Sequence, residues 1–213
     1  MTCLNPAESI TNLTLALEKH KKFSYINVTK SAIIALSKNS DNSFPSHFAK
    51  SVIASLKNND PMMMKAISHS LVSDIEDGKH YKIGLHKNGT YYYSNIFEYY
   101  YMNNKDVYNS TVNYYIKNSP SVVITFHDKK LIQKHFGNSA HIINVAYTSY
   151  YEKLDNIYAQ LTEFEGGVDY CIMDCGVLGL ALASKIWDNL NMSILDFGKT
   201  LSLSKTPQTV SVA

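Results

Sequence analysis

A glycine-containing turn between an apolar strand and a helix is the strongest chemical signal in the sequence. It reads Asp174-Cys175-Gly176-Val177-Leu178-Gly179. Glycines let the backbone approach a ligand closely, and the N–H groups at a helix N-terminus attract phosphate. The pattern also fits a tight strand-to-helix turn in which Gly179 only permits close packing. We expect Cys175, Gly176 and Val177 to contact a phosphate-bearing ligand.

A second polar turn, Asp196-Phe197-Gly198-Lys199, follows the last strand expected in the chain. Ligands of open α/β sheets bind outside the carboxyl ends of the strands. Asp196 is therefore a candidate general base or ribose ligand, and Lys199 is a candidate phosphate contact. The alternatives are a loop carboxylate that caps a neighbouring element and a solvated lysine.

Other strand ends also carry polar side chains. Thr29, Lys30 and Ser31 offer hydroxyls and a cation, although an N-cap followed by an exposed lysine fits equally well. His127-Asp128 ends the apolar segment SVVITF and offers a pair for hydroxyl recognition or proton transfer. The segment 147–151 adds hydroxyls and aromatic faces. The spacing of histidines and cysteines does not match a metal site, so none is predicted.

The elements that must position these residues alternate. The expected strands span 121–126, 141–146, 169–173 and 193–197, and the helices between them span 129–136, 151–164 and 176–189. Such alternation is typical of a parallel sheet. We therefore predict an α/β fold with a Rossmann-like, mostly parallel sheet flanked by helices. We expect residues 1–200 to form one domain and residues 201–213 a flexible tail. Within the domain, residues 40–118 should form a mostly helical insertion or lid that includes a helix over 62–72.

The composition narrows the class of protein. The 213 residues are 45% hydrophobic and 18% charged, the net charge is +2, and all 20 residues counted as Lys or Arg are lysine. Phosphate must then be met by lysines, hydroxyls or backbone N–H groups. No apolar run approaches the about 20 residues that span a bilayer, and no signal peptide is recognisable, so we expect a cytoplasmic protein without a membrane partner. The abundance of Asn, Lys, Tyr and Ile is typical of AT-rich coding sequences, as in a virus or an AT-rich bacterium.

The C-terminal half resembles the GT-D class of glycosyltransferases, a family once called a domain of unknown function. That family carries a strand, an (S/A)xGxxA turn into a helix, and a last strand that ends in DxG. These features are matched by Asp174-Cys175-Gly176-Val177-Leu178-Gly179-Leu180-Ala181 and by Asp196-Phe197-Gly198, within a resemblance over residues 20–200. The resemblance implies a nucleotide diphosphate sugar as the donor, bound across the carboxyl edge of the sheet.

The family's N-terminal motif, SfxRxGDGE, is altered in this chain. Its DxE carboxylates serve metal-linked binding of the nucleotide sugar. In the matching segment 24–32, Lys30 and Ala32 replace the two carboxylates, and Asn27 replaces the arginine. This argues against a divalent metal. We hypothesise that Lys30 stands in for the cation and balances the leaving diphosphate.

The resemblance therefore predicts a nucleotide-sugar-dependent glycosyltransferase, and the AT-rich coding bias and small size suggest that a phage encodes it. Asp196, or else Asp174 or Asp128, would deprotonate the acceptor hydroxyl. The residues expected to bind the donor are Thr29, Lys30, Ser31, His127, Cys175, Gly176, Val177 and Lys199. The first acceptor to consider is hydroxymethylated cytosine in double-stranded DNA, with a protein or a surface glycan as the alternative. An inactive nucleotide- or sugar-binding phage protein, favoured by the missing carboxylates, and another Rossmann-like transferase are the rival interpretations.

Overall fold

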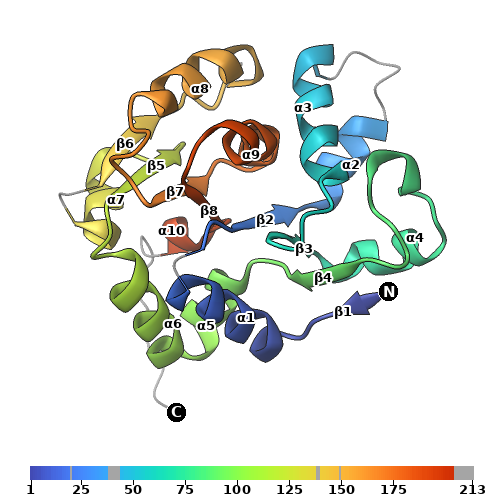
Figure 1. The fold of residues 1–213 in the computed structure, drawn as a ribbon, viewed down its shortest axis with the longest axis horizontal. Coiled ribbons are helices and arrows are strands. Elements are labelled where there is room, and N and C mark those ends of the chain that lie inside the picture. The colour runs from blue at the N-terminus through green and yellow to red at the C-terminus, as the bar shows by residue number, and fades with distance from the viewer. Residues whose placement is uncertain (20, 38–43, 138–139, 149, 204–213) are drawn as a thin grey trace.

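The structure, a computed structural model, describes residues 1–19, 21–37, 44–137, 140–148 and 150–203. Within these ranges the chain forms an eight-stranded sheet between two layers of helices (Figure 1). The strands are β1 (Thr2–Cys3), β2 (Ser24–Val28), β3 (Met63–Ile67), β4 (Thr90–Tyr93), β5 (Ser121–Thr125), β6 (His141–Asn144), β7 (Tyr170–Asp174) and β8 (Ser193–Asp196).

The α-helices lie between these strands and after the last of them. They are α1 (Pro6–Glu18), α2 (Lys30–Ser37), α3 (Ser46–Lys57), α4 (Val72–Glu76), α5 (Ile96–Asn103), α6 (Lys105–Thr111), α7 (Lys129–Phe136), α8 (Leu154–Thr162), α9 (Val177–Asn189) and α10 (Thr200–Leu203). Short 3-10 turns span His69–Leu71, Tyr81–Ile83 and Tyr150–Lys153, and a π-helical turn spans Val112–Ile116. No helix in the described part of the chain is both long and apolar enough to cross a membrane.

The strand order is β1-β4-β3-β2-β8-β7-β5-β6, and every pair of neighbouring strands is parallel. This confirms the predicted α/β fold with helices around a parallel sheet. Because the strands all run the same way, their carboxyl ends meet at one edge. The polar turns singled out from the sequence follow those ends.

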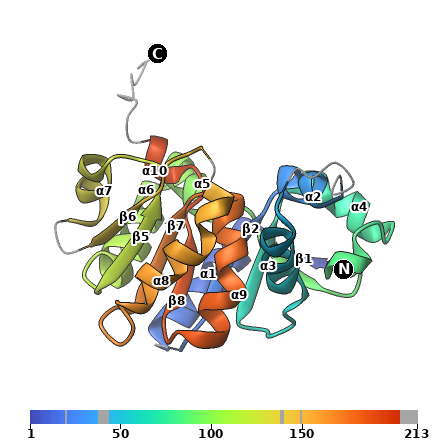
Figure 2. The ribbon, with the colours of Figure 1, turned by 90° about the horizontal axis from the view of Figure 1, so that it is seen from above.

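Alternating side chains of the strands build two cores, one on each face of the sheet. On β2, for example, Ile26 and Val28 join one core and Tyr25 joins the other. The first core packs beneath α3, α8 and α9, which lie side by side over the sheet (Figures 1 and 2). The second packs against α1, α5, α6, α7 and α10. Both faces are covered, as a parallel sheet requires.

The largest difference from the prediction lies at residues 62–72, where the expected helix is wrong. Met63–Ile67 is instead β3, paired with all five residues of β2. Met, Lys and Ala are good helix formers, but pairing within a buried sheet overrides local propensity. A turn begins the strand, because the side chain of Asp60 accepts a hydrogen bond from the N–H of Met62 at 2.8 Å.

Two larger expectations also need adjustment. Residues 40–118, expected to form a mostly helical insertion or lid, contribute β3 and β4 to the central sheet. Within the expected tail, residues up to Leu203 belong to α10, and Leu201 is buried in the second core. The remainder of that tail, 204–213, lies outside the described residues.

Candidate active site

A cleft of about 790 Å³ opens at the carboxyl edge of the sheet. Its lining comes from turns that follow six different strands, together with residues near the start of α3. The lining residues are Asn27, Thr29, Ala32, Phe44, Asn95, Phe126, His127, Tyr147, Tyr150, Asp174, Cys175, Gly176, Val177, Asp196, Gly198 and Lys199. The fold therefore brings together most of the residues selected from the sequence.

A hydrogen-bonded corner of Asn27, Asn95, Asp196 and Gly198 forms one side of the cleft. The N–H of Asn27 donates to Asp196 Oδ2 at 3.0 Å, and the N–H of Gly198 donates to Asp196 Oδ1 at 2.9 Å. The Asn27 amide donates to the carbonyl of Asp196 at 3.0 Å and accepts from the N–H of Asn95 at 2.7 Å. Asp196 thus ties β8 to β2, and Asn27 extends the connection to the end of β4.

Backbone strain marks the same corner. Asn95 has φ of 53°, which is uncommon for a residue with a side chain, and Gly198 has φ of 56°. A Cβ at Gly198 would lie 2.6 Å from Oδ1 of Asn95. The close approach therefore requires glycine at this position, and the corner is held rigidly.

These hydrogen bonds decide what Asp196 can do. The residue is 4% exposed, and burial raises the pKa of its carboxyl to about 6, while the bonds from Gly198 and Asn27 hold it lower than burial alone would. Both carboxylate oxygens already accept backbone N–H groups. Asp196 is therefore better suited to fixing the corner than to taking a proton from a substrate.

Asp174 has the opposite environment. Its Oδ2 is buried and accepts no hydrogen bond from the described residues, although Nε2 of His127 lies 3.1 Å away. Burial, aided by the nearby Asp196 carboxylate, raises the pKa of Asp174 to about 7. A protonated Asp174 can donate to a neutral imidazole at that distance, so the two groups can share one proton. The pair is well matched to proton transfer near neutral pH.

The glycine turn forms the floor of the cleft. Gly176 is the N-cap of α9 with φ of 56° and ψ of −130°, a conformation that favours glycine, and no side chain caps the helix there. Gly176 and Val177 line the cleft, so the positive end of the α9 dipole is directed into it. Burial raises the pKa of the neighbouring Cys175 thiol, which stays neutral at physiological pH. An anionic group fits this floor.

Aromatic rings form the wall opposite the polar corner. The ring of Phe126 lies 5.1 Å from that of Tyr147 and 5.6 Å from that of Tyr150. Tyr147 is 75% exposed, so one face of its ring is open to a ligand. The segment 147–151 was expected to supply such faces, and the wall can stack against a planar base.

Some predicted residues lie elsewhere. The side chain of Lys30 is 51% exposed and lies 3.8 Å from Oδ2 of Asp74, and it does not line the cleft. Asp128 caps α7 by accepting from the N–H of Leu131 at 3.0 Å. Ser31 lies in the first turn of α2, but its side chain is outside the described residues. Lys199 is thus the one lysine among the described residues that line the cleft.

The cleft differs from the metal site that the family resemblance implies. No group of three or more His, Cys, Asp or Glu side chains that could hold a metal ion occurs in the described ranges. In the alignment that the sequence resemblance implies, Lys30 and Ala32 stand where the family has carboxylates, and both oxygens of Asp196 accept backbone hydrogen bonds. The described residues of the cleft therefore do not fit the carboxylate metal site that the resemblance implies.

The class of fold follows from the parallel sheet and the position of the cleft. Solved structures with the same architecture include two of domain of unknown function 1792 (DUF1792), one substituted with selenomethionine and one described as having a distinct glycosyltransferase fold. They match with TM-scores of 0.69 and 0.66, each at 12% identity over 96% of this chain and 80% of the other. A third, described as a new glycosyltransferase (DUF1792) from Streptococcus sanguinis, matches with a TM-score of 0.69 at 10% identity over 96% and 84% of the two chains.

The chain therefore has this glycosyltransferase fold, and the resemblance noted in the sequence is confirmed at the level of fold. No protein-family model matches the chain, and no curated protein matches it by sequence.

Two site residues escaped the sequence-based selection. Asn27 was noted only as a replacement for an arginine, and Asn95 was not singled out. Their role depends on β2, β4 and β8 ending at one corner, which no local pattern reveals. The available signal was an asparagine two residues after a β-prone run of tyrosines, because asparagine tolerates positive φ better than most residues.

Proposed function

We propose that this protein transfers a sugar from a nucleotide diphosphate donor to a hydroxyl acceptor. The observation that carries the proposal is the composition of the cleft. In a glycosyltransferase fold, a proton-accepting pair of Asp174 and His127 lies in one cleft with an open helix N-terminus and Lys199. These groups meet the two needs of the reaction, which are removal of the acceptor proton and stabilisation of the leaving diphosphate.

In the proposed reaction the acceptor oxygen attacks the anomeric carbon of the donor. A new carbon–oxygen bond forms while the bond from the anomeric carbon to the diphosphate breaks, and the diphosphate leaves with the electron pair. The acceptor proton passes to the Asp174 carboxylate, which His127 orients. The negative charge of the diphosphate is balanced by Lys199 and by the N–H groups at the start of α9.

The proposal reassigns two roles. Lys199 replaces Lys30 as the cation for the diphosphate, because Lys30 lies beside Asp74 outside the cleft lining. Asp174 replaces Asp196 as the base, because Asp196 accepts two backbone hydrogen bonds. The aromatic wall of Phe126, Tyr147 and Tyr150 is the proposed platform for the nucleobase.

For the acceptor, hydroxymethylated cytosine in phage DNA is the first substrate to test, and a protein or a surface glycan is the second. The supporting argument is the AT-rich composition of the chain. An inactive binding protein is the rival function, favoured by Lys30 and Ala32 at the positions of the family's carboxylates.

A donor screen separates these functions. Thermal shift with nucleoside diphosphates and their sugars, with and without Mn²⁺, identifies the donor. Release of nucleoside diphosphate is then measured with hydroxymethylated DNA, unmodified DNA or glycans as acceptors. Turnover with one acceptor supports the transferase, whereas tight donor binding without turnover on any acceptor supports the binding protein.

A further inference from the structure

A second cavity, of about 380 Å³, lies beside the amino-terminal half of β3 and contains a buried lysine. β4 pairs with Ala66 and Ile67 of β3 but not with Met63–Lys65. This part of β3 therefore has no neighbouring strand on the β4 side, and Met63 and Lys65 line the cavity there. Lys65 is 8% exposed. The other lining residues are Asn58, Asn59, Asp60, Pro61, Gly84, His86, Gly89, Thr90, Tyr91 and Tyr92.

The charge of Lys65 is incompletely compensated. Its ammonium donates one hydrogen bond, to the carbonyl of Leu56 near the end of α3, although an ammonium has three donors. No ion pair joins Lys65 to a carboxylate in the described part of the chain. Burial lowers the pKa of the amine to about 8, which still leaves it mostly charged at neutral pH. A buried cation without a counter-charge is costly.

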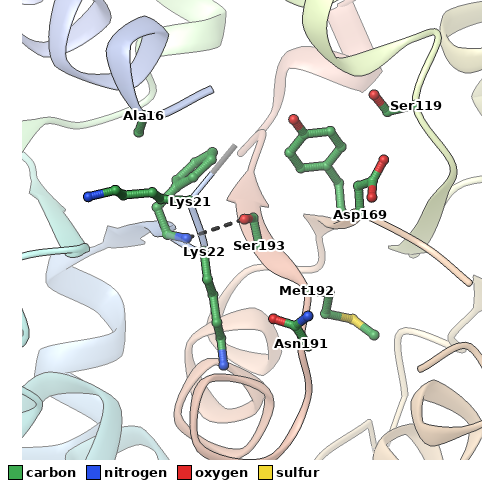
Figure 3. A pocket seen from close by; sticks show the side chains of 10 residues that line it. Ala16, Lys21, Lys22, Ser119, Asp169, Asn191, Met192 and Ser193 are labelled. Atoms are coloured by element: carbon green, nitrogen blue, oxygen red, sulfur yellow. Dashed lines mark hydrogen bonds between the residues drawn. The ribbon is translucent and has the colours of Figure 1, made fainter. Parts of the chain in front are cut away.

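A comparison with Lys22 shows that a hydrogen bond to a helix C-terminus does not require a buried lysine without a carboxylate nearby. Lys22 also donates to a carbonyl near a helix C-terminus, that of Trp187 in α9, and its ammonium lies 5.0 Å from the Trp187 ring. It lines a smaller, polar hollow of about 200 Å³ beside Ser193 (Figure 3). The carboxylates of Asp188, Asp60 and Glu165 counter the effect of burial on the pKa of Lys22. Among the described residues, no carboxylate counters the effect of burial on the pKa of Lys65 in this way.

The walls of the cavity are closely built. Gly84, with φ of 99°, passes so near α3 that a Cβ would lie 2.6 Å from the same Leu56 carbonyl that Lys65 contacts. The hydroxyl of Tyr91 accepts from the N–H of His86 at 2.7 Å and donates to its carbonyl at 3.1 Å. Tight walls around an empty space beside an ammonium are the geometry of a binding site.

We propose that this cavity binds a small phosphate-bearing molecule, whose phosphate pairs with the ammonium of Lys65. The hydroxyl of Thr90 and the amides of Asn58 and Asn59 are further polar groups of the lining. Asp60 also lines the cavity, and its Oδ1 accepts a hydrogen bond from the N–H of Met62. Because Asp60 carries a negative charge, it repels the bound phosphate and limits the affinity of the site. The site is separate from the cleft at the carboxyl edge and does not depend on the function proposed for it.

Thermal shift with inorganic phosphate tests the site, with acetate and chloride at equal ionic strength as references. The background is Lys199→Ala, which removes the cleft lysine. Phosphate should raise the melting temperature of Lys199→Ala and of the double variant Lys199→Ala/Lys22→Met. It should leave the melting temperature of Lys199→Ala/Lys65→Met unchanged. An equal rise in Lys65→Met, or no rise in any variant, would overturn the proposal, and so would a rise with acetate as large as that with phosphate.

A second variant keeps the test decisive if Lys65→Met does not fold. Asp60→Asn removes the opposing charge and retains an Oδ1 acceptor for the N–H of Met62. Isothermal titration should show that this variant binds phosphate several-fold more tightly than the parent, because a like charge has been removed from the cavity. An unchanged or weaker affinity contradicts the assignment of the phosphate to this cavity.

Discussion

The substitution Asp174→Asn should stabilise the folded protein at alkaline pH. Burial, aided by the Asp196 charge, raises the pKa of Asp174 from 3.8 to about 7. Each pH unit between these two pKa values is worth about 1.4 kcal/mol, so ionising the group in the folded state costs about 4 kcal/mol at pH 8. The stabilising effect of the protonated group is complete below pH 3.8 and is lost as pH rises through 7.

Urea unfolding of both proteins at pH 5 and pH 8 measures the effect. Roughly 1.5 kcal/mol of the ionisation cost is already present in the wild type at pH 5. The difference in free energy of unfolding, Asp174→Asn minus wild type, should therefore be about 3 kcal/mol larger at pH 8 than at pH 5. Groups that do not contact Asp174 contribute equally in both proteins and largely cancel in the difference, whereas the coupling of Asp174 to His127, 3.1 Å away, is part of the effect measured.

Asp196→Asn is the matched control, because it changes the same chemistry at a neighbouring carboxyl. Both oxygens of Asp196 accept backbone N–H groups, and an asparagine has one oxygen, so one buried donor loses its partner. The lost hydrogen bond should cost about 1–3 kcal/mol of stability. Because the pKa of Asp196 is raised only to about 6, the gain of this variant on the wild type between pH 5 and pH 8 should be smaller than that of Asp174→Asn. If the difference between Asp174→Asn and the wild type is the same at pH 5 and pH 8, the assigned environment of Asp174 is refuted.

Three further predictions concern ligand binding and the turn that supports it. Lys199→Ala should raise the KM for the donor about tenfold, while Lys30→Ala leaves it unchanged, and steady-state kinetics that rank them in reverse contradict the reassignment. Gly176→Ala should lower the free energy of unfolding by about 1–3 kcal/mol through backbone strain alone, since nothing lies within 4 Å of the added Cβ; a urea midpoint equal to the wild type would show no strain. Tyr147→Ala should weaken donor binding about tenfold by titration calorimetry, whereas the equally exposed Tyr114→Ala has no effect; parallel losses in both would argue against stacking.

The C-terminal half of the fold was predictable because its signals are local. The apolar segments that became β5 and β7 are buried on both faces, and the glycine turn before α9 follows the second of them directly. β3 was not predictable in this way. Its sequence, MMKAI, favours a helix locally, and only pairing with β2 and β4 makes it a strand.

The positions of the site residues were predicted better than their roles. The rule that ligands bind at the carboxyl edge of a parallel sheet predicted that Asp174, Asp196 and Lys199 lie near one another, and all three line one cleft. Whether a carboxylate is free to take a proton depends on its hydrogen-bond donors. For Asp196 one donor is the N–H of Asn27, which lies 169 residues away in the chain. Lys30 likewise contacts Asp74, which lies in α4 after β3, a strand whose sequence had suggested a helix.

The most direct test of the account is the release of nucleoside diphosphate from the donor that the thermal-shift screen identifies, in the presence of a hydroxyl acceptor. Asp174→Asn is compared with the wild type from pH 5.5 to 8.5. The account predicts that wild-type kcat/KM rises with pH through about 7, as the base loses its proton. It also predicts that Asp174→Asn binds the donor but turns over at least about 100-fold more slowly. A wild-type protein that binds the donor without releasing diphosphate, or an Asp174→Asn variant of full activity, would contradict it.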